Sequence, residues 1–100
     1  ALAKVRAVGA RCAQALPALR RALAEGGPAR LAEGFRVLLR EAETGRVLGA
    51  FALKLMPHLM PPTEGDAAQW QTLLEEFAEL CGLMEAAGRD GGSRTAEVNR

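Results

Sequence analysis

Apolar residues recur every three or four positions through most of the chain, and helix-breaking residues divide them into segments. In the first segment they stand at Leu2, Val5, Val8, Cys12, Leu16, Leu19 and Leu23. At 100° per residue these positions share an arc of about 120°, which is typical of an amphipathic helix. Pro17 removes a backbone hydrogen bond, so we expect a kink or a short break near Ala15–Pro17.

The second helix is predicted from about Pro28 to Glu41 or Ala42. Gly26, Gly27 and Pro28 separate it from the first, because glycine suits the end of a helix and proline its first turn. Gly34 lies within it, where a missing side chain would let a neighbouring helix approach closely or is merely tolerated.

A third helix is predicted from about Gly45 to Leu59, antiparallel to the second, with Thr44 as its N-cap. Its apolar residues form one stripe, but Leu53 and Met56 fall on the opposite side. A helix that is apolar nearly all round is either enclosed by its neighbours or leaves part of its surface open for a ligand. We interpret it as the central helix of the fold, ended or kinked near His58 by Pro57.

The fourth helix should follow a proline-rich loop at residues 60–65. Asp66 and Gln69 have the spacing of a capping box, and Ala87 and Gly88 end the pattern. The predicted inner stripe consists of Trp70, Leu73, Leu74, Phe77, Leu80, Cys81 and Met84. Residues 89–100 lack apolar periodicity, which indicates a disordered tail. The sequence therefore predicts an all-α fold, a small bundle of four to five antiparallel helices over residues 1–88.

Composition agrees with one small globular domain, since 49% of the 100 residues are hydrophobic and 25% are charged. The charge is unevenly spread: residues 1–50 carry nine Lys/Arg against four Glu, and residues 51–100 carry four against eight acidic residues. Such polarity favours contacts between basic and acidic helices within the chain. No stretch approaches the roughly 18 apolar residues of a membrane span, and four aromatic residues offer little for stacking on bases. We expect neither a membrane nor a nucleic acid as a direct partner.

Candidate chemistry is sparse, and we expect no enzyme, cofactor or metal site. His58 is the only histidine and Ser93, the only serine, falls in the predicted tail. Glu75 and Glu79 lie one turn apart, but an exposed helix face lacks the concave setting that acid–base catalysis needs; it is a solvated face or a docking surface for a basic partner. The two cysteines, at positions 12 and 81, are interpreted as buried free thiols in an intracellular protein, with a long-range disulfide as the alternative.

The remaining possibility is an apolar groove for a helical segment of another protein. Methionine adapts its shape to varied apolar partners, and Met56 and Met60 flank the expected bend at Pro57, although core filling also accounts for them. The residues predicted to contact such a partner are Leu19, Leu23, Phe35, Leu38, Phe51, Leu53, Leu55 and Met56.

The helix order resembles the paired amphipathic helix domains of transcriptional corepressor scaffolds and the related harmonin-homology domains. The apolar positions that carry the resemblance lie within residues 16–82. They include Leu31, Phe35 and Leu38, then Val47, Phe51 and Leu55, then the segment QTLLEEFAEL. The resemblance implies a cleft between the first helices that accepts an amphipathic helix from a disordered partner, in a scaffold or nuclear protein that regulates transcription. The alternative function, of a different class, is that of a structural domain that self-associates, for example as a homodimer, through the exposed side of its third helix.

Overall fold

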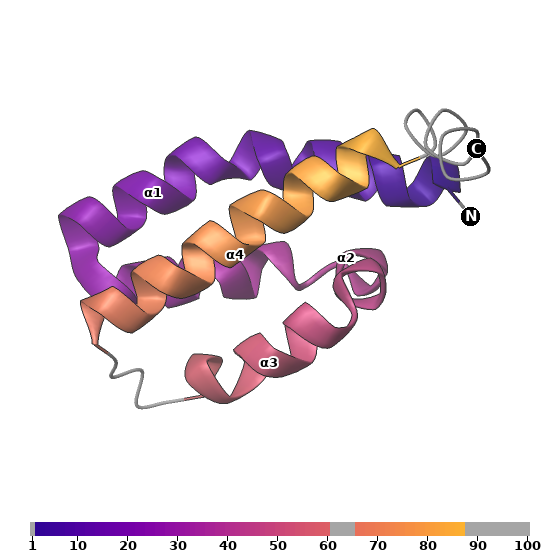
Figure 1. Ribbon diagram of the computed structural model, residues 1–100. Helices are drawn as coiled ribbons and strands as arrows, with labels where there is room; N and C mark the ends of the chain where they lie inside the picture. Colours follow the sequence, from indigo (N-terminus) through magenta and orange to yellow (C-terminus); the bar gives the residue numbers. More distant parts are fainter. Residues whose placement is uncertain (1, 61–65, 88–100) are drawn as a thin grey trace, which may run out of the picture.

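The computed structural model describes residues 2–60 and 66–87, which form four helices and their short connections (Figure 1). Within these ranges there is no strand, so the predicted all-α bundle is confirmed. The helices are α1 (Leu2–Leu38), α2 (Ala42–Leu48), α3 (Ala50–Leu59) and α4 (Ala67–Ala86). The predicted tail at 89–100 and most of the predicted loop at 60–65 lie outside the described residues.

Helix α1 is a helical hairpin with two arms. Gly27 has φ 76° and ψ −168°, a conformation that residues with a side chain rarely adopt, and Pro28 follows it. The first arm (residues 2–26) and the second arm (residues 28–38) run in opposite directions on either side of this turn (Figure 1). The break predicted between the first two helices is therefore confirmed.

The break into two helices that was one expectation near Ala15–Pro17 is wrong. The backbone keeps helical φ/ψ values through this stretch, and Gly27 is the residue of α1 that departs from them. Pro17 is exposed, so the carbonyl that loses its donor there can be hydrated instead. One missing hydrogen bond on a wet face does not interrupt a helix whose other side packs along its length.

Two short helices replace the predicted third helix. Gly49 separates α2 from α3 with φ 54° and ψ −118°, and its N–H donates a hydrogen bond to the carbonyl of Gly45 at 3.1 Å. Thr44 was expected to be an N-cap, but it lies inside α2 with 1% of its surface exposed. The predicted end is correct, because α3 continues through Pro57 and stops at Leu59.

Helix α4 begins and ends where the sequence predicts. Asp66 is its N-cap, with the carboxylate accepting a hydrogen bond from the Ala68 N–H at 3.1 Å. Ala87 is the C-cap, and its N–H donates to the carbonyl of Met84 at 3.2 Å. Every member of the predicted inner stripe is buried except Leu80, which is half-buried.

The core lies where α4 packs against the two arms of α1. Phe35 of the second arm is its centre, because its ring meets Phe77 edge-on at 5.1 Å and lies within 6.5 Å of the rings of Phe51 and Trp70. Gly9 permits the closest approach of the first arm to α4: a Cβ at this position would lie 2.7 Å from Cβ of Met84. Gly34 likewise faces Leu19 of the opposite arm, in agreement with the close approach expected there.

The third apolar segment is not the centre of the bundle. Helix α3 lies at its edge (Figure 1), with Ala52 and Leu55 buried but Leu53 and Met56 exposed. The physical reason is angular: apolar side chains on opposite sides of one helix cannot all point to the same core. The central position belongs to α4, whose large apolar residues, apart from the exposed Leu83, occupy a single face.

Ion pairs join the basic first arm to acidic residues elsewhere, and the pair of Arg20 with Glu75 connects the basic and acidic halves of the chain as the uneven charge predicts. Arg20 pairs with Glu75 of α4 at 3.2 Å, Lys4 pairs with Glu43 at 3.7 Å, and Arg11 pairs with Glu41. These side chains are largely exposed, so each pair contributes only about 0–1 kcal/mol. Their effect is on orientation rather than on overall stability.

Candidate binding groove beside helix α3

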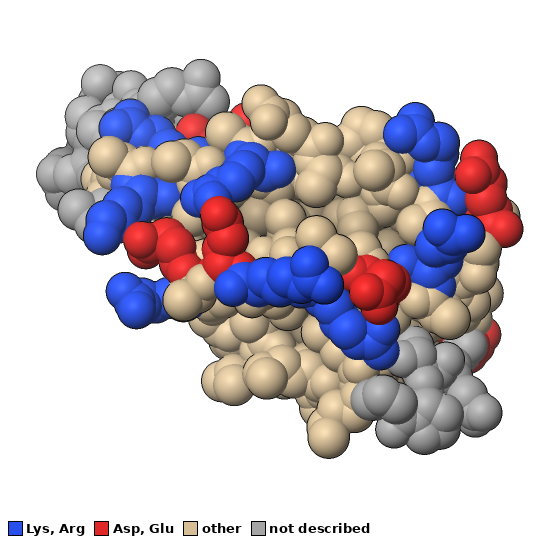
Figure 2. Space-filling view, turned by 180° about the vertical axis from the view of Figure 1, so that it is seen from behind, with Lys and Arg blue, Asp and Glu red and all other residues tan. Residues whose placement is uncertain are grey.

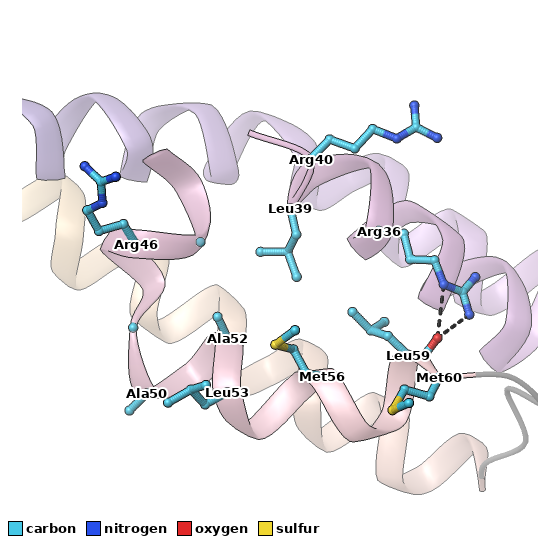
Figure 3. A pocket seen from close by; sticks show the side chains of 12 residues that line it. Arg36, Leu39, Arg40, Arg46, Ala50, Ala52, Leu53, Met56, Leu59 and Met60 are labelled. Carbon is cyan, nitrogen blue, oxygen red and sulfur yellow. Dashed lines mark hydrogen bonds between the residues drawn. The ribbon is translucent and has the colours of Figure 1, made fainter. Parts of the chain in front are cut away.

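A groove of about 880 Å³ runs between α3, α2 and the end of the second arm of α1. We call it the α3 groove. Figure 3 shows Leu39 and Met56 pointing toward each other from opposite walls. The lining residues are Arg36, Leu39, Arg40, Gly45, Arg46, Gly49, Ala50, Ala52, Leu53, Met56, Leu59 and Met60.

Three large apolar side chains form a ridge along one wall. Leu53, Met56 and Met60 have 71%, 54% and 68% of their surface exposed. They follow one another at intervals of three and four residues, so those on α3 lie one above the other on one face. Single exposed apolar residues are ordinary, whereas a contiguous row beside a groove marks an interaction surface.

Arg36 fixes the far end of this wall. Its guanidinium donates two hydrogen bonds to the carbonyl of Leu59, from Nε at 3.1 Å and from Nη2 at 2.5 Å (Figure 3). Its Nη1 also lies 2.9 Å from a carboxylate oxygen of Glu33. Because the last carbonyls of a helix have no partner within the helix, this contact caps α3 and ties it to the second arm.

Basic side chains border the groove. Arg40 and Arg46 are exposed at its rim, and within the described parts of the chain neither takes part in an ion pair. None of the described residues that line the groove is acidic. Figure 2 shows uncharged surface along the lower edge of the molecule, where α3 lies, with Lys and Arg side chains and some acidic ones above it.

The structure separates the eight residues that the sequence predicts to contact a partner. Leu53 and Met56 line the α3 groove. Leu19, Phe35 and Leu55 are buried in the core, and Leu23, Leu38 and Phe51 are half-buried against it.

A cleft between the first helices, as the resemblance implies, would need those core side chains on its surface. Here α4 covers the inner faces of both arms of α1, so Leu19, Phe35 and Leu55 cannot touch a partner while the fold is intact. The accessible apolar surface lies instead beside α3.

Sequence reasoning missed the other half of the groove. Periodicity places Leu39 on the inner stripe and Arg40 on the outer side of a second helix that runs to about Glu41, and it gives no indication for Arg46. The second arm in fact ends at Leu38, and α2 turns away from it. The sequence held one further signal for the groove, Met60, which flanks Pro57 together with Met56.

A smaller groove of about 350 Å³ lies on the other side of α3, against α4. Lys54 spans it, with Nζ 2.7 and 3.0 Å from the two carboxylate oxygens of Glu76. Leu83 of α4 borders it and is 60% exposed. The ion pair divides this surface, so it offers less continuous apolar area than the α3 groove.

The side chains considered above as candidate catalytic groups make contacts within the fold. His58 meets the Trp70 ring edge-on at 5.9 Å, and Glu75 is held by Arg20 and Gln71. Among the described residues, no group of three or more His, Cys, Asp or Glu is arranged to hold a metal ion. No helix in the described ranges is both long and apolar enough to cross a bilayer.

The two cysteines are free and buried, as the sequence indicates, Cys12 on α1 and Cys81 on α4. The neighbouring Cys12 thiol and the burial of Cys81 together raise the pKa of Cys81 well above its ordinary range. A buried thiol that keeps its proton is a poor nucleophile, so Cys81 serves the core.

No protein-family model, curated protein or solved structure matches the chain. The function must therefore be argued from the site itself.

Proposed function

We propose that this domain is a non-catalytic interaction module that binds an amphipathic helical segment of a partner protein in the α3 groove. The observation that carries the proposal is the row of Leu53, Met56 and Met60 left exposed along a concave surface. A scaffold or regulatory protein, the class that the helix order resembles, is the context in which such a module operates.

The shape of the groove favours a helix over other ligands. The exposed row follows the axis of α3, and an apolar stripe with residues at i, i+3, i+4 and i+7 is its natural complement. Leu39 on the opposite wall would contact the other side of the same stripe (Figure 3). Two adaptable methionines in the wall suit a partner whose side chains vary in shape.

The experiment begins with a displayed library of peptides of about 18 residues, patterned as amphipathic helices. We expect the selected peptides to bind the protein with dissociation constants of about 1–100 μM, and Leu53→Gln to weaken that affinity at least tenfold. Leu83→Gln is the matched control, because it removes an equally exposed leucine outside the α3 groove.

A second pair of variants consists of one that blocks the groove and a matched control, and neither touches the core. A Cβ at Gly45 or at Gly82 meets no atom within 4 Å, and both glycines lie inside helices. Gly45→Phe adds a ring beside the groove and should weaken the same peptides, whereas Gly82→Phe on α4 should not. Equal binding by all four variants, with circular dichroism unchanged, would contradict the proposal, as would a library that yields no helical binder.

A further inference from the structure

The α3 groove has a charged rim as well as an apolar floor, and its charge is of one sign. Arg40 stands at the end of the second arm and Arg46 on α2, on the side of the groove opposite the apolar row of α3 and with both guanidinium groups directed outward (Figure 3). Arg20 and Lys54 have a carboxylate partner on α4, whereas Arg6 and Arg21 are exposed and unpaired within the described residues but lie outside the groove.

From this arrangement we infer that the segment recognised by the α3 groove is an acidic amphipathic helix, with Glu or Asp beside its apolar stripe. The inference rests on the function proposed above and adds the chemical class of the partner. Carboxylates on the flank of the helix turned away from α3 would lie near Arg40 at the end of the second arm and Arg46 on α2.

Electrostatics gives the two arginines a role that packing does not. Arginine presents a planar set of donors that matches a carboxylate, and a basic rim raises the association rate of an acidic ligand while disfavouring a basic one. Within the described part of the chain Arg40 and Arg46 have no carboxylate partner, which is consistent with a rim whose counter-charges arrive with the ligand. Arg36 adds little to this positive field, because the Glu33 carboxylate largely neutralises its charge.

The same surface fits two other occupants less well. An anionic bilayer is flat, whereas here apolar side chains line both walls of a concavity and the ridge of α3 stands on one side only. A second copy docked groove to groove would bring the same lining, in which no described residue is acidic, and so would offer no carboxylate to Arg40 and Arg46. Like charges in such an interface cost affinity rather than supply it.

The test uses one selected peptide in three versions that share the apolar stripe and differ in flanking residues: Glu, Gln or Lys. On the wild-type protein we expect the Glu version to bind about tenfold tighter than the Gln version and the Lys version to bind weakest, with the preference shrinking as salt is raised. Arg40→Glu with Arg46→Glu should reverse the order.

The control for net charge is Arg6→Glu with Arg21→Glu. Both residues are exposed, lie outside the α3 groove and take part in no ion pair within the described part of the chain, and the double substitution changes the total charge by the same amount. It should leave the order of the three peptides unchanged. A reversal in this control too would mean that net charge alone decides, and would overturn the inference.

The remaining outcomes separate the two levels of the proposal. If all three peptides bind equally and Leu53→Gln weakens each of them, the acidic partner is overturned while the groove function stands. If none binds the folded protein, the groove function falls as well. Binding to phosphatidylserine vesicles that both Leu53→Gln and the Arg40/Arg46 double variant abolish, or a dimer in sedimentation that Leu53→Gln dissociates, would replace the peptide with a membrane or a second copy.

Discussion

Helices α3 and α4 are both rich in apolar residues, yet they use them differently. Helix α4 places six residues in the core and turns its glutamates outward. Helix α3 buries only Ala52 and Leu55 and leaves Leu53 and Met56 in contact with solvent. The comparison shows that the distribution of apolar residues around a helix, rather than their number, decides whether the helix completes a core or presents a surface.

The difference has an energetic counterpart. Burying a leucine or methionine side chain is worth about 1.5–3 kcal/mol relative to leaving it exposed, and α4 has already gained this stabilisation. In α3 the same gain remains available to a ligand, reduced by the entropy lost on association. Helix α4 therefore stabilises the fold, and α3 can stabilise a complex.

The largest effect should come from the aromatic core beneath α4. Phe77→Ala removes a fully buried ring that packs on Phe35 and on Phe51, and we expect a loss of about 3–5 kcal/mol in the free energy of unfolding. Urea denaturation followed by circular dichroism measures it. A loss below about 1 kcal/mol would mean that α4 is not the structural centre.

An intermediate effect is expected where the first arm touches α4. In Gly9→Ala the new Cβ would lie 2.7 Å from Cβ of Met84 and 2.9 Å from the backbone nitrogen of Glu85, so one helix must move. Such overpacking costs about 1–3 kcal/mol. Gly82→Ala on the open face of the same α4 is the control, and it should raise stability by about 0.5–1 kcal/mol because alanine is the better helix former. Similar effects of the two variants in thermal melts would argue against close packing at Gly9.

The smallest effect on stability is expected in α3. Leu53→Gln should change the free energy of unfolding by no more than about 0.5 kcal/mol, because most of its side chain contacts water. Leu55→Ala, two positions along the same helix, should cost about 2–5 kcal/mol because Leu55 is fully buried. A Leu53 variant as unstable as the Leu55 variant would show that the exposed row is part of the core in solution.

Much of the fold could be predicted from the sequence because its signals are local. The Asp66 cap, the single-faced stripe of α4 and the Gly27-Pro28 turn each depend on neighbouring residues alone. The outcome at two positions could not be predicted in this way. Pro17 is tolerated on an exposed face, and Gly49 divides the segment that the pattern treats as one helix.

The groove was only half predictable for a different reason. Leu53 and Met56 were found because they contradict the pattern of their own helix. Leu39, Arg40 and Arg46 follow their patterns and become neighbours only through the angle at which α2 leaves the second arm (Figure 3). That angle is set at residues 39–41, and the positive φ of Gly49 sets the direction of α3 after α2; periodicity carries no information about either.

The clamp that Arg36 places on the Leu59 carbonyl has a thermodynamic consequence. One end of α3 is continuous with the turn at Gly49 and the other is held by two hydrogen bonds, so the wall of the groove is already in place before any ligand arrives. A receptor whose shape is set in advance loses little conformational freedom when it is occupied, and in such a complex the ordering cost falls mainly on the incoming chain. The tightness of the complex should then follow how readily the partner forms a helix in isolation.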